Sequence, residues 1–204
     1  SDKMKKLALV LVLVLCASVA NAQWYEDNIG LYLDAAATEY CLVDAGGGQF
    51  HVYLIGTNLT AGSNKGIEIK VSTVGGGVQQ ANWSWGYPAI DLGTRVDEHV
   101  IVPNDPQPII NGQFIFAEFD ILIWDATEPT FGFLDKIYFD SNDTGLPNYL
   151  DGDDPTLETI LPMRNSTGDP TAPGTNFPVL ILNGDCFVVP NEDASWGDVK
   201  ALFK

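Results

Sequence analysis

Residues 140–151 form the segment best suited to chemistry, because their oxygen-bearing side chains have the spacing of a calcium-binding loop. Positions one, three, five, nine and twelve of this segment are Asp140, Asn142, Thr144, Asn148 and Asp151, with Gly145 at position six. Calcium takes about six to eight oxygen ligands, and one tight loop with this spacing can supply several of them. Thr144 and Asp151 depart from the usual residues at their positions. Two interpretations stay open, a calcium site and a solvated acidic loop with Asx turns.

An aromatic row gives a second candidate site. Trp83, Trp85 and Tyr87 alternate along the chain, and alternate residues of a β-strand point to the same side. If that side is exposed, the row predicts a carbohydrate-binding surface on which sugar rings stack. If it is buried, the same residues supply apolar area to an ordinary core, which is where large aromatic side chains are most often found.

The C-terminal residues carry an amphipathic pattern. Ser195 can cap a short helix whose apolar face consists of Trp196, Val199, Leu202 and Phe203. A helix this short needs a partner surface. The segment is therefore either a docking or sorting peptide, or a helix packed against its own domain.

No catalytic residues are predicted. The two histidines, His51 and His99, lie in segments with strand-like alternation, and no nucleophile elbow, zinc-protease motif, phosphate loop or dinucleotide fingerprint occurs. We therefore expect a protein that is not an enzyme, with calcium as its one candidate cofactor.

The beginning of the chain predicts export. Lys5 and Lys6 precede an apolar run, and Ala20-Asn21-Ala22 supplies the small residues of a cleavage site, which together are typical of a secretory signal peptide. We expect residues 1–22 to be removed, so that the protein is secreted and acts extracellularly, at the cell surface or in a periplasm. A retained membrane anchor is the alternative, although the apolar run is short for a bilayer span.

Two cysteines remain after such a cleavage, Cys41 and Cys186. In an oxidising compartment an isolated pair predicts a disulfide, whereas two buried free thiols are the alternative. The bond would close a loop of nearly the whole domain, which the chain-entropy model values at about 4–5 kcal/mol as an upper figure.

The charge of the chain limits its partners. The formal net charge is −17, which repels nucleic acid and anionic lipid surfaces. We expect an extracellular protein or glycan as partner, or self-association, with no nucleic acid and no membrane span after cleavage.

Strand patterns dominate residues 23–190, and Gly- and Pro-rich turns separate them. The expected strands are Ile29–Asp34, Glu39–Val43, Gln49–Thr57, Gly66–Val74, Val78–Trp85, Arg95–Val102, Gln113–Trp124, Phe131–Phe139 and Val179–Val188. A phase change near Ala117 predicts a β-bulge. The pattern indicates an all-β fold, a two-sheet antiparallel sandwich with a short C-terminal helix in the tail at residues 191–204.

Several short motifs resemble those of uncharacterised secreted bacterial β-sandwich proteins of cohesin-like or immunoglobulin-like type. They are Asp27-Asn28-Ile29-Gly30-Leu31-Tyr32-Leu33-Asp34, Cys41, Asn183-Gly184-Asp185-Cys186 and the terminal Trp196-Gly197-Asp198-Val199-Lys200-Ala201-Leu202-Phe203-Lys204. The resemblance implies a cohesin-like or immunoglobulin-like sandwich and an exported location. It implies no activity, and we expect a non-catalytic binding or structural module. Cohesins bind dockerins, but no residue of such an interface can be carried over to this chain.

Overall fold

The computed structural model describes residues 26–166 and 178–186, and every regular element in these two ranges is a strand. The strands are β1 (Asn28–Tyr32), β2 (Cys41–Leu42), β3 (Gly48–Thr57), β4 (Ser63–Val74), β5 (Val78–Ser84), β6 (Ala89–Asp91), β7 (Glu98–Pro103), β8 (Gln107–Pro108), β9 (Phe114–Ile123), β10 (Thr130–Asp135), β11 (Asn148–Asp151), β12 (Ile160–Pro162), β13 (Arg164–Asn165) and β14 (Leu180–Leu182). Within these ranges the structure contains no helix that could cross a membrane. The predicted leader and the predicted C-terminal helix both lie outside them.

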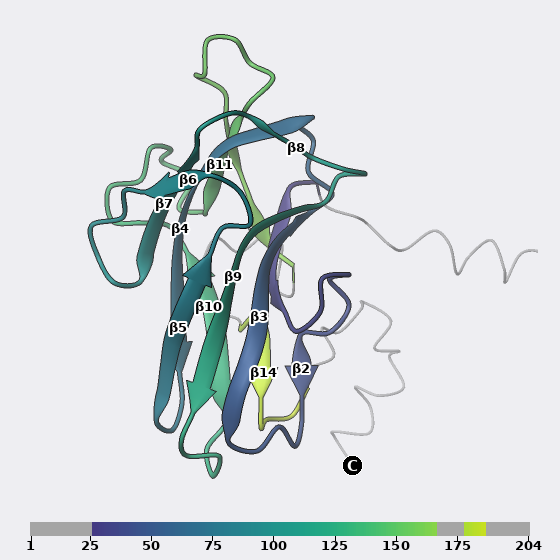
Figure 1. The fold of residues 1–204 in the computed structure, drawn as a ribbon, viewed down its shortest axis with the longest axis vertical. Helices are drawn as coiled ribbons and strands as arrows, with labels where there is room; N and C mark the ends of the chain where they lie inside the picture. Colours follow the sequence, from purple (N-terminus) through teal and green to yellow (C-terminus); the bar gives the residue numbers. More distant parts are fainter. Residues whose placement is uncertain (1–25, 167–177, 187–204) are drawn as a thin grey trace, which may run out of the picture.

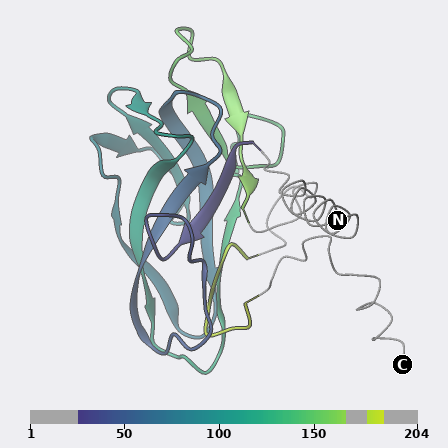
Figure 2. The same cartoon turned by 90° about the vertical axis from the view of Figure 1, so that its right-hand side faces the viewer.

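The strands form two sheets that pack face to face (Figures 1 and 2). One sheet has five strands in the order β13-β1-β3-β9-β5. The other has nine, with the path β12-β11-β4-β10-β14-β2 and with β7 and β8 paired to β4 and β6 paired to β7. The predicted all-β, two-sheet fold is therefore confirmed.

The sheets are mixed rather than purely antiparallel, which corrects one part of the prediction. Antiparallel pairs make up the centre, but β1 pairs with β13 and β14 pairs with β2 in parallel. In each of these pairs one partner, β13 or β2, is only two residues long and stands at the edge of its sheet. Pairs this short come from packing of distant chain segments, which local alternation does not reveal.

The core lies between the sheets and consists of the inward-facing apolar residues of both. Its fully buried members include Ile29, Leu31, Val52, Leu54, Ile67, Ile69, Val71, Ile101, Phe116, Phe119, Ile121, Leu134, Tyr149, Leu180 and Leu182. The expected bulge in β9 is present. Leu54 pairs with Ala117 and Ile55 with Ile115, so Phe116 is an extra residue on β9. This extra residue allows the aromatic side chains on both sides of the phase change to point into the core.

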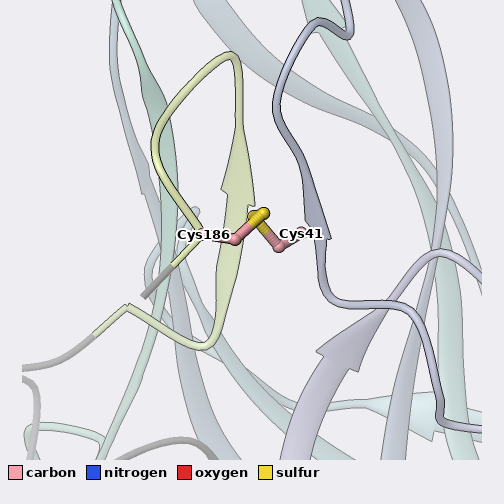
Figure 3. The surroundings of a disulfide bond; sticks show 2 residues. All are labelled: Cys41 and Cys186. Carbon is pink, nitrogen blue, oxygen red and sulfur yellow. A yellow bond between two sulfur atoms is a disulfide. The ribbon is translucent and has the colours of Figure 1, made fainter. Parts of the chain in front are cut away.

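The predicted disulfide joins Cys41 on β2 to Cys186 just beyond β14 (Figure 3). The two Cα atoms are 5.7 Å apart, which is an ordinary separation for a disulfide. Since β14 also pairs with β2 through Ile181 and Cys41, the covalent link reinforces a contact that the sheet already makes. It ties the beginning of the described fold to its end.

Between β10 and β11, which both pair with β4, the chain leaves the nine-stranded sheet as a long loop. Ile67 pairs with Tyr149 and with Ile101, and Lys70 pairs with Asp135 and with Glu98. Since a strand has two edges and β7 occupies one, β10 and β11 must share the other. Residues 136–147 leave this shared edge between β10 and β11, and we call them the strap.

The strap corrects two predictions. The strand expected at Phe131–Phe139 ends at Asp135, because its buried face consists of Thr130, Gly132 and Leu134 and the next residue on that face would be Lys136. A lysine cannot enter the core without a partner. The second correction concerns residues 148–151, expected to complete a calcium loop, which instead form the strand β11.

Candidate functional site

The strap crosses the outer face of the nine-stranded sheet and is anchored on both sides of its crossing. The backbone amide of Tyr138 donates to Glu98 Oε1 at 3.1 Å, and Glu98 belongs to β7, beyond β4. The amide and hydroxyl of Ser141 donate to the Glu68 carboxylate on β4. Glu68 and Glu98 alternate with the buried Ile67, Ile69 and Ile101, so both carboxylates face outward. The strap is thus held by two glutamates from neighbouring strands.

Two aromatic side chains project from this anchored loop. Tyr138 is 64% exposed and Phe139 is 75% exposed. Their rings meet edge to face with centroids 4.7 Å apart, and the Arg95 guanidinium lies 4.3 Å from the Tyr138 ring centroid. Val96, next to Arg95 in the loop between β6 and β7, is 97% exposed. We call Arg95, Val96, Tyr138 and Phe139 the strap patch.

The strap patch is rigidly supported. Arg95 Nη1 reaches Glu98 Oε1 at 3.4 Å, and this is the same oxygen that accepts the Tyr138 amide. A cation–π contact and a shared carboxylate therefore join the β6–β7 loop to the strap. The two segments project on the same side of the molecule (Figure 1). Exposed aromatic rings on a fixed backbone need no further ordering before they bind.

Two of the five predicted calcium ligands come together where the strap meets β11. Asn148 Nδ2 donates to Asp140 Oδ1 at 2.6 Å, and the amide of Asn142 donates to the same oxygen at 3.2 Å. Asn148 is 1% exposed, and the Asp140 side chain is 6% exposed. The remaining oxygens, Asp140 Oδ2 and Asn148 Oδ1, are buried and accept no hydrogen bond. Lys136 Nζ lies 3.9 Å from Asp140 Oδ2, which is beyond hydrogen-bond distance.

The other predicted ligands do not join this pair as side-chain donors in a single loop. Thr144 lies on the exposed part of the strap, and Asp151 is at the far end of β11 from Asn148. Three residues of strand span about 10 Å. Asp151 Oδ1 instead accepts the amide of Asp153. In the described ranges, no three His, Cys, Asp or Glu side chains converge as a metal cluster.

The following acidic residues are used in local structure. Asp153 accepts hydrogen bonds from the amide of Gly62 and the hydroxyl of Ser63. Asp154 accepts the hydroxyls and amides of Thr156 and Thr159, and these bonds, those from the Thr159 hydroxyl foremost, lower the pKa of the Asp154 carboxyl. Both carboxylates therefore stabilise the turn after β11.

The aromatic row at Trp83, Trp85 and Tyr87 packs against the core. All three side chains are partly buried and contact the core cluster. The Trp83 ring stacks on Phe119 with centroids 4.1 Å apart and an interplanar angle of 11°. The Tyr87 hydroxyl donates to the Phe116 carbonyl at 3.0 Å, and burial raises the pKa of Tyr87 well above its ordinary value. The row thus supports the sandwich from the end of β5.

A buried histidine supports the row from the other sheet. His99 on β7 is 6% exposed, and its ring lies 4.1 Å from Trp83, centroid to centroid. His99 Nδ1 is 2.7 Å from Asp91 Oδ2 on β6. Partial burial raises the pKa of the Asp91 carboxyl, but hydrogen bonds with His99 and from the amides of Gly93 and Val100 outweigh this and lower the pKa overall. The pair thus connects β6 to β7 behind the Trp83 ring.

The outer face of the five-stranded sheet carries a self-contained polar cluster. Asp120 Oδ2 accepts Gln49 Nε2 at 2.8 Å and Asn82 Nδ2 at 2.7 Å, and Asp120 Oδ1 lies 3.0 Å from His51 Nδ1. The hydrogen bond from Asn82, followed by that from His51, lowers the pKa of Asp120. His51 also pairs with Glu118 at 3.3 Å. Both carboxylate oxygens of Asp120 therefore have hydrogen-bond partners within this cluster.

Tyr138, Phe139 and Arg95 were not predicted as site residues from the sequence. Tyr138 and Phe139 fell within an expected strand, where alternation would have turned one of them inward. The available signal was Lys136, which stands at a position of the buried face and marks the end of the strand. Arg95 gave no signal, because its contact with Tyr138 joins segments that are 43 residues apart by number.

Comparison with known proteins gives one remote structural likeness. No protein-family model and no curated protein matches the chain. A solved structure of the sixth cohesin from scaffoldin B of Acetivibrio cellulolyticus, in complex with a mutant dockerin, is similar, with 10% sequence identity and a TM-score of 0.48. The match covers 79% of this chain and 100% of that chain. No residue role is carried over from it.

Proposed function

We propose that this chain is a secreted, non-catalytic module that binds a partner protein through the strap patch. The observation that carries the proposal is the exposure of Tyr138 and Phe139 on a loop that is pinned by Glu68 and Glu98. Most large aromatic side chains of the described fold are at least partly buried; Tyr138 and Phe139, like Trp124 at 65%, are exposed, and these two are held on a fixed support. Adjacent exposed apolar rings of this kind are typical of interaction sites.

The composition of the strap patch favours a protein partner. Tyrosine and arginine are enriched among the residues that contribute most to protein–protein affinity. Tyr138 brings a large ring with few rotatable bonds, Arg95 is already oriented over it, and Phe139 and Val96 extend the apolar contact. Desolvation of these groups on binding would provide the free energy, and the anchored strap would reduce the entropy lost.

The charge of the chain indicates the chemistry of the partner. The formal net charge is −17; Asp143 is exposed on the strap, and Asp97 in the β6–β7 loop pairs with Lys70 at 3.2 Å. A partner surface with an apolar centre and a basic rim would complement the strap patch and the acidic residues of this chain. Such a complex would form faster at low ionic strength, because long-range attraction steers the encounter.

An exported location agrees with the disulfide. A Cys41–Cys186 bond persists where the surroundings are oxidising, that is outside the cytoplasm. The acidic surface also suits a soluble extracellular protein. The location of the chain, extracellular, cell-surface or periplasmic, remains part of the proposal.

A carbohydrate-binding module using Trp83, Trp85 and Tyr87 is the alternative function, and it stays a prediction. It would need the three rings on a free face, but they pack against the core and Trp83 stacks on Phe119. Binding of this chain to a glycan array, lost when Trp85 is replaced, would support that alternative over the strap patch.

The test compares two exposed apolar residues. The disulfide-bonded protein and its Phe139→Ser and Leu157→Ser variants are used to capture partners from the culture fluid of the source organism, and a captured protein is purified and its affinity measured. Leu157 is 46% exposed and belongs to the turn between β11 and β12. We expect Phe139→Ser to weaken binding at least tenfold and Leu157→Ser to leave it unchanged. Equal binding by all three proteins would refute the strap patch as the binding surface.

A further inference from the structure

We infer that Asp140 Oδ2 and Asn148 Oδ1, two buried oxygens without hydrogen-bond donors where the strap meets β11, bind calcium, with Lys136 as a competing cation. The inference does not rest on the proposed protein-binding function. It also differs from the loop predicted by donor spacing, because Thr144 and Asp151 are not ligands of this site.

The first step in the argument is the chemistry of the two donors. A carboxylate and an amide carbonyl are the hard oxygen ligands that calcium prefers. Asp140 and Asn148 are joined by a 2.6 Å hydrogen bond from Asn148 Nδ2 to Asp140 Oδ1. This bond also fixes the orientation of the amide, because the reverse orientation would place two acceptors against each other. Asn148 Oδ1 is therefore the side-chain atom of this residue that has no hydrogen-bond partner.

Both donor oxygens are also buried. Asn148 is 1% exposed and the Asp140 side chain is 6% exposed, and one oxygen of each accepts no hydrogen bond. A buried acceptor without a donor is costly, and a buried carboxylate oxygen is more so. Calcium bound to Asp140 Oδ2 and Asn148 Oδ1 would satisfy both oxygens, with water completing its coordination. Water alone is the competing occupant.

The third step concerns Lys136, which already faces the same carboxylate. Its Nζ lies 3.9 Å from Asp140 Oδ2, and its side chain is 43% exposed. A pair this long and this exposed is weak, so an entering ion can displace the lysine into solvent. Removal of the ammonium should then strengthen calcium binding, which is the opposite of what a purely structural role for Lys136 predicts.

The number of charged ligands also determines the expected affinity of the site for calcium. A site with one carboxylate has little charge to attract a divalent ion, so a dissociation constant of about 10⁻³ M is expected, as in weak extracellular calcium modules. Ten millimolar calcium would then raise the melting temperature by roughly 4 °C. The same ion would hold the strap on β11, where Asn148 begins the strand.

The experiment measures the melting temperature of the intact disulfide-bonded protein in chelator, in calcium and in magnesium, with sodium chloride added to equalise ionic strength. Five proteins are compared: wild type, Asp140→Asn, Lys136→Ala, Asp151→Asn and Asp143→Asn. Asp143 is an exposed carboxylate of the same strap, and Asp151 is position twelve of the loop predicted from spacing. Calcium binding to wild type and to Lys136→Ala is also titrated by calorimetry, in case Asp140→Asn does not fold.

The expected result is a calcium-specific rise in wild type that Asp140→Asn abolishes and that Asp151→Asn and Asp143→Asn retain. Lys136→Ala should bind calcium several-fold more tightly than wild type. No rise in wild type would overturn the inference and leave water as the partner of these two oxygens. An effect lost equally in Asp143→Asn or Asp151→Asn, or weaker calcium binding by Lys136→Ala, would also overturn it. None of these outcomes bears on partner capture by Phe139, so the two proposals fail separately.

Discussion

Two groups of aromatic residues in this molecule have similar composition and opposite surroundings. Trp83, Trp85 and Tyr87 follow one another along β5 and the turn after it, and their rings pack on the core. Tyr138 and Phe139 are adjacent on the strap and are mostly exposed. The first group lies where strand alternation directs side chains inward. The second lies on a loop whose backbone is fixed but whose side chains have no neighbouring sheet to cover them.

The difference shows that the support behind an aromatic residue indicates its role better than the residue type does. The Trp83 ring contacts Phe119 and His99, so its surface is packed against the fold and contributes to stability. Tyr138 is held through its amide and touched on its ring by Arg95, so much of its surface remains available. We therefore expect substitutions in the first group to change the free energy of unfolding and substitutions in the second to change binding.

Trp83→Ala should have the largest effect on stability. The substitution removes the ring that stacks on Phe119 and lies against His99, which should lower the free energy of unfolding by about 3 kcal/mol. Urea denaturation followed by circular dichroism provides the measurement. A loss below about 0.5 kcal/mol, the size expected of a surface substitution, would show that the row is not part of the core and would favour its use in carbohydrate binding.

Asp91→Asn should have the next largest effect, because Asp91 orients the histidine behind Trp83. Loss of a hydrogen bond to a charged group should reduce stability by about 1.5 kcal/mol at pH 7. The pKa of Asp91 is lowered in the folded protein, so the stabilisation is present above the unfolded pKa of about 3.9 and is lost as pH falls through the folded value. The difference in stability between wild type and variant should therefore stay constant from pH 7 to about pH 4 and shrink progressively as pH falls further toward pH 2. A difference that stays constant down to pH 2 would contradict this account of Asp91.

Tyr87→Phe should cost about 1 kcal/mol, since it removes the hydrogen bond to the Phe116 carbonyl and keeps the ring. Burial raises the pKa of Tyr87, so the stability of wild type is fully present below the unfolded pKa of about 10 and declines as pH rises above it. Denaturation at pH 8 and at pH 11 should show the variant losing less stability than wild type. Equal losses would mean that Tyr87 ionises freely in the folded state.

Phe139→Ser should have the smallest effect on stability, within about 0.5 kcal/mol, because the ring has few contacts to lose. Its melting temperature should match that of wild type. A substantial destabilisation would place Phe139 with the packed aromatic residues and remove the distinction between the two groups.

The regular parts of the fold follow from local sequence patterns, whereas the site depends on contacts between distant segments. The phase change near Ala117 predicts the bulge in β9, and two cysteines with an export signal predict the disulfide; both are confirmed. The strap was missed because a run of apolar residues conceals the point at which β10 ends. Lys136 marks that point only when the buried face of the strand is known.

The predicted calcium loop illustrates the same limit. Spacing along the chain identified Asp140 and Asn148, which the fold brings together across the strap. It also included Asp151, which β11 carries away from them. A donor pattern assumes a loop, and pairing with β4 turns its last third into strand. The strand expected at Glu39–Val43 is present as β2, but its parallel pairing with β14 and the strand β13 could not be predicted for a related reason, since they form only when the rest of the sheet is present.

The most direct test of the proposed function is photo-crosslinking from the two exposed positions. A photoreactive phenylalanine analogue is placed at residue 139 in one protein and at residue 157 in another, and each is irradiated in the culture fluid of the source organism. We expect one protein partner to be crosslinked from position 139, to be displaced by excess wild type, and to be absent from position 157. Crosslinking of the same partner from position 157 alone, or displacement by Phe139→Ser as effective as by wild type, would contradict binding through the strap patch.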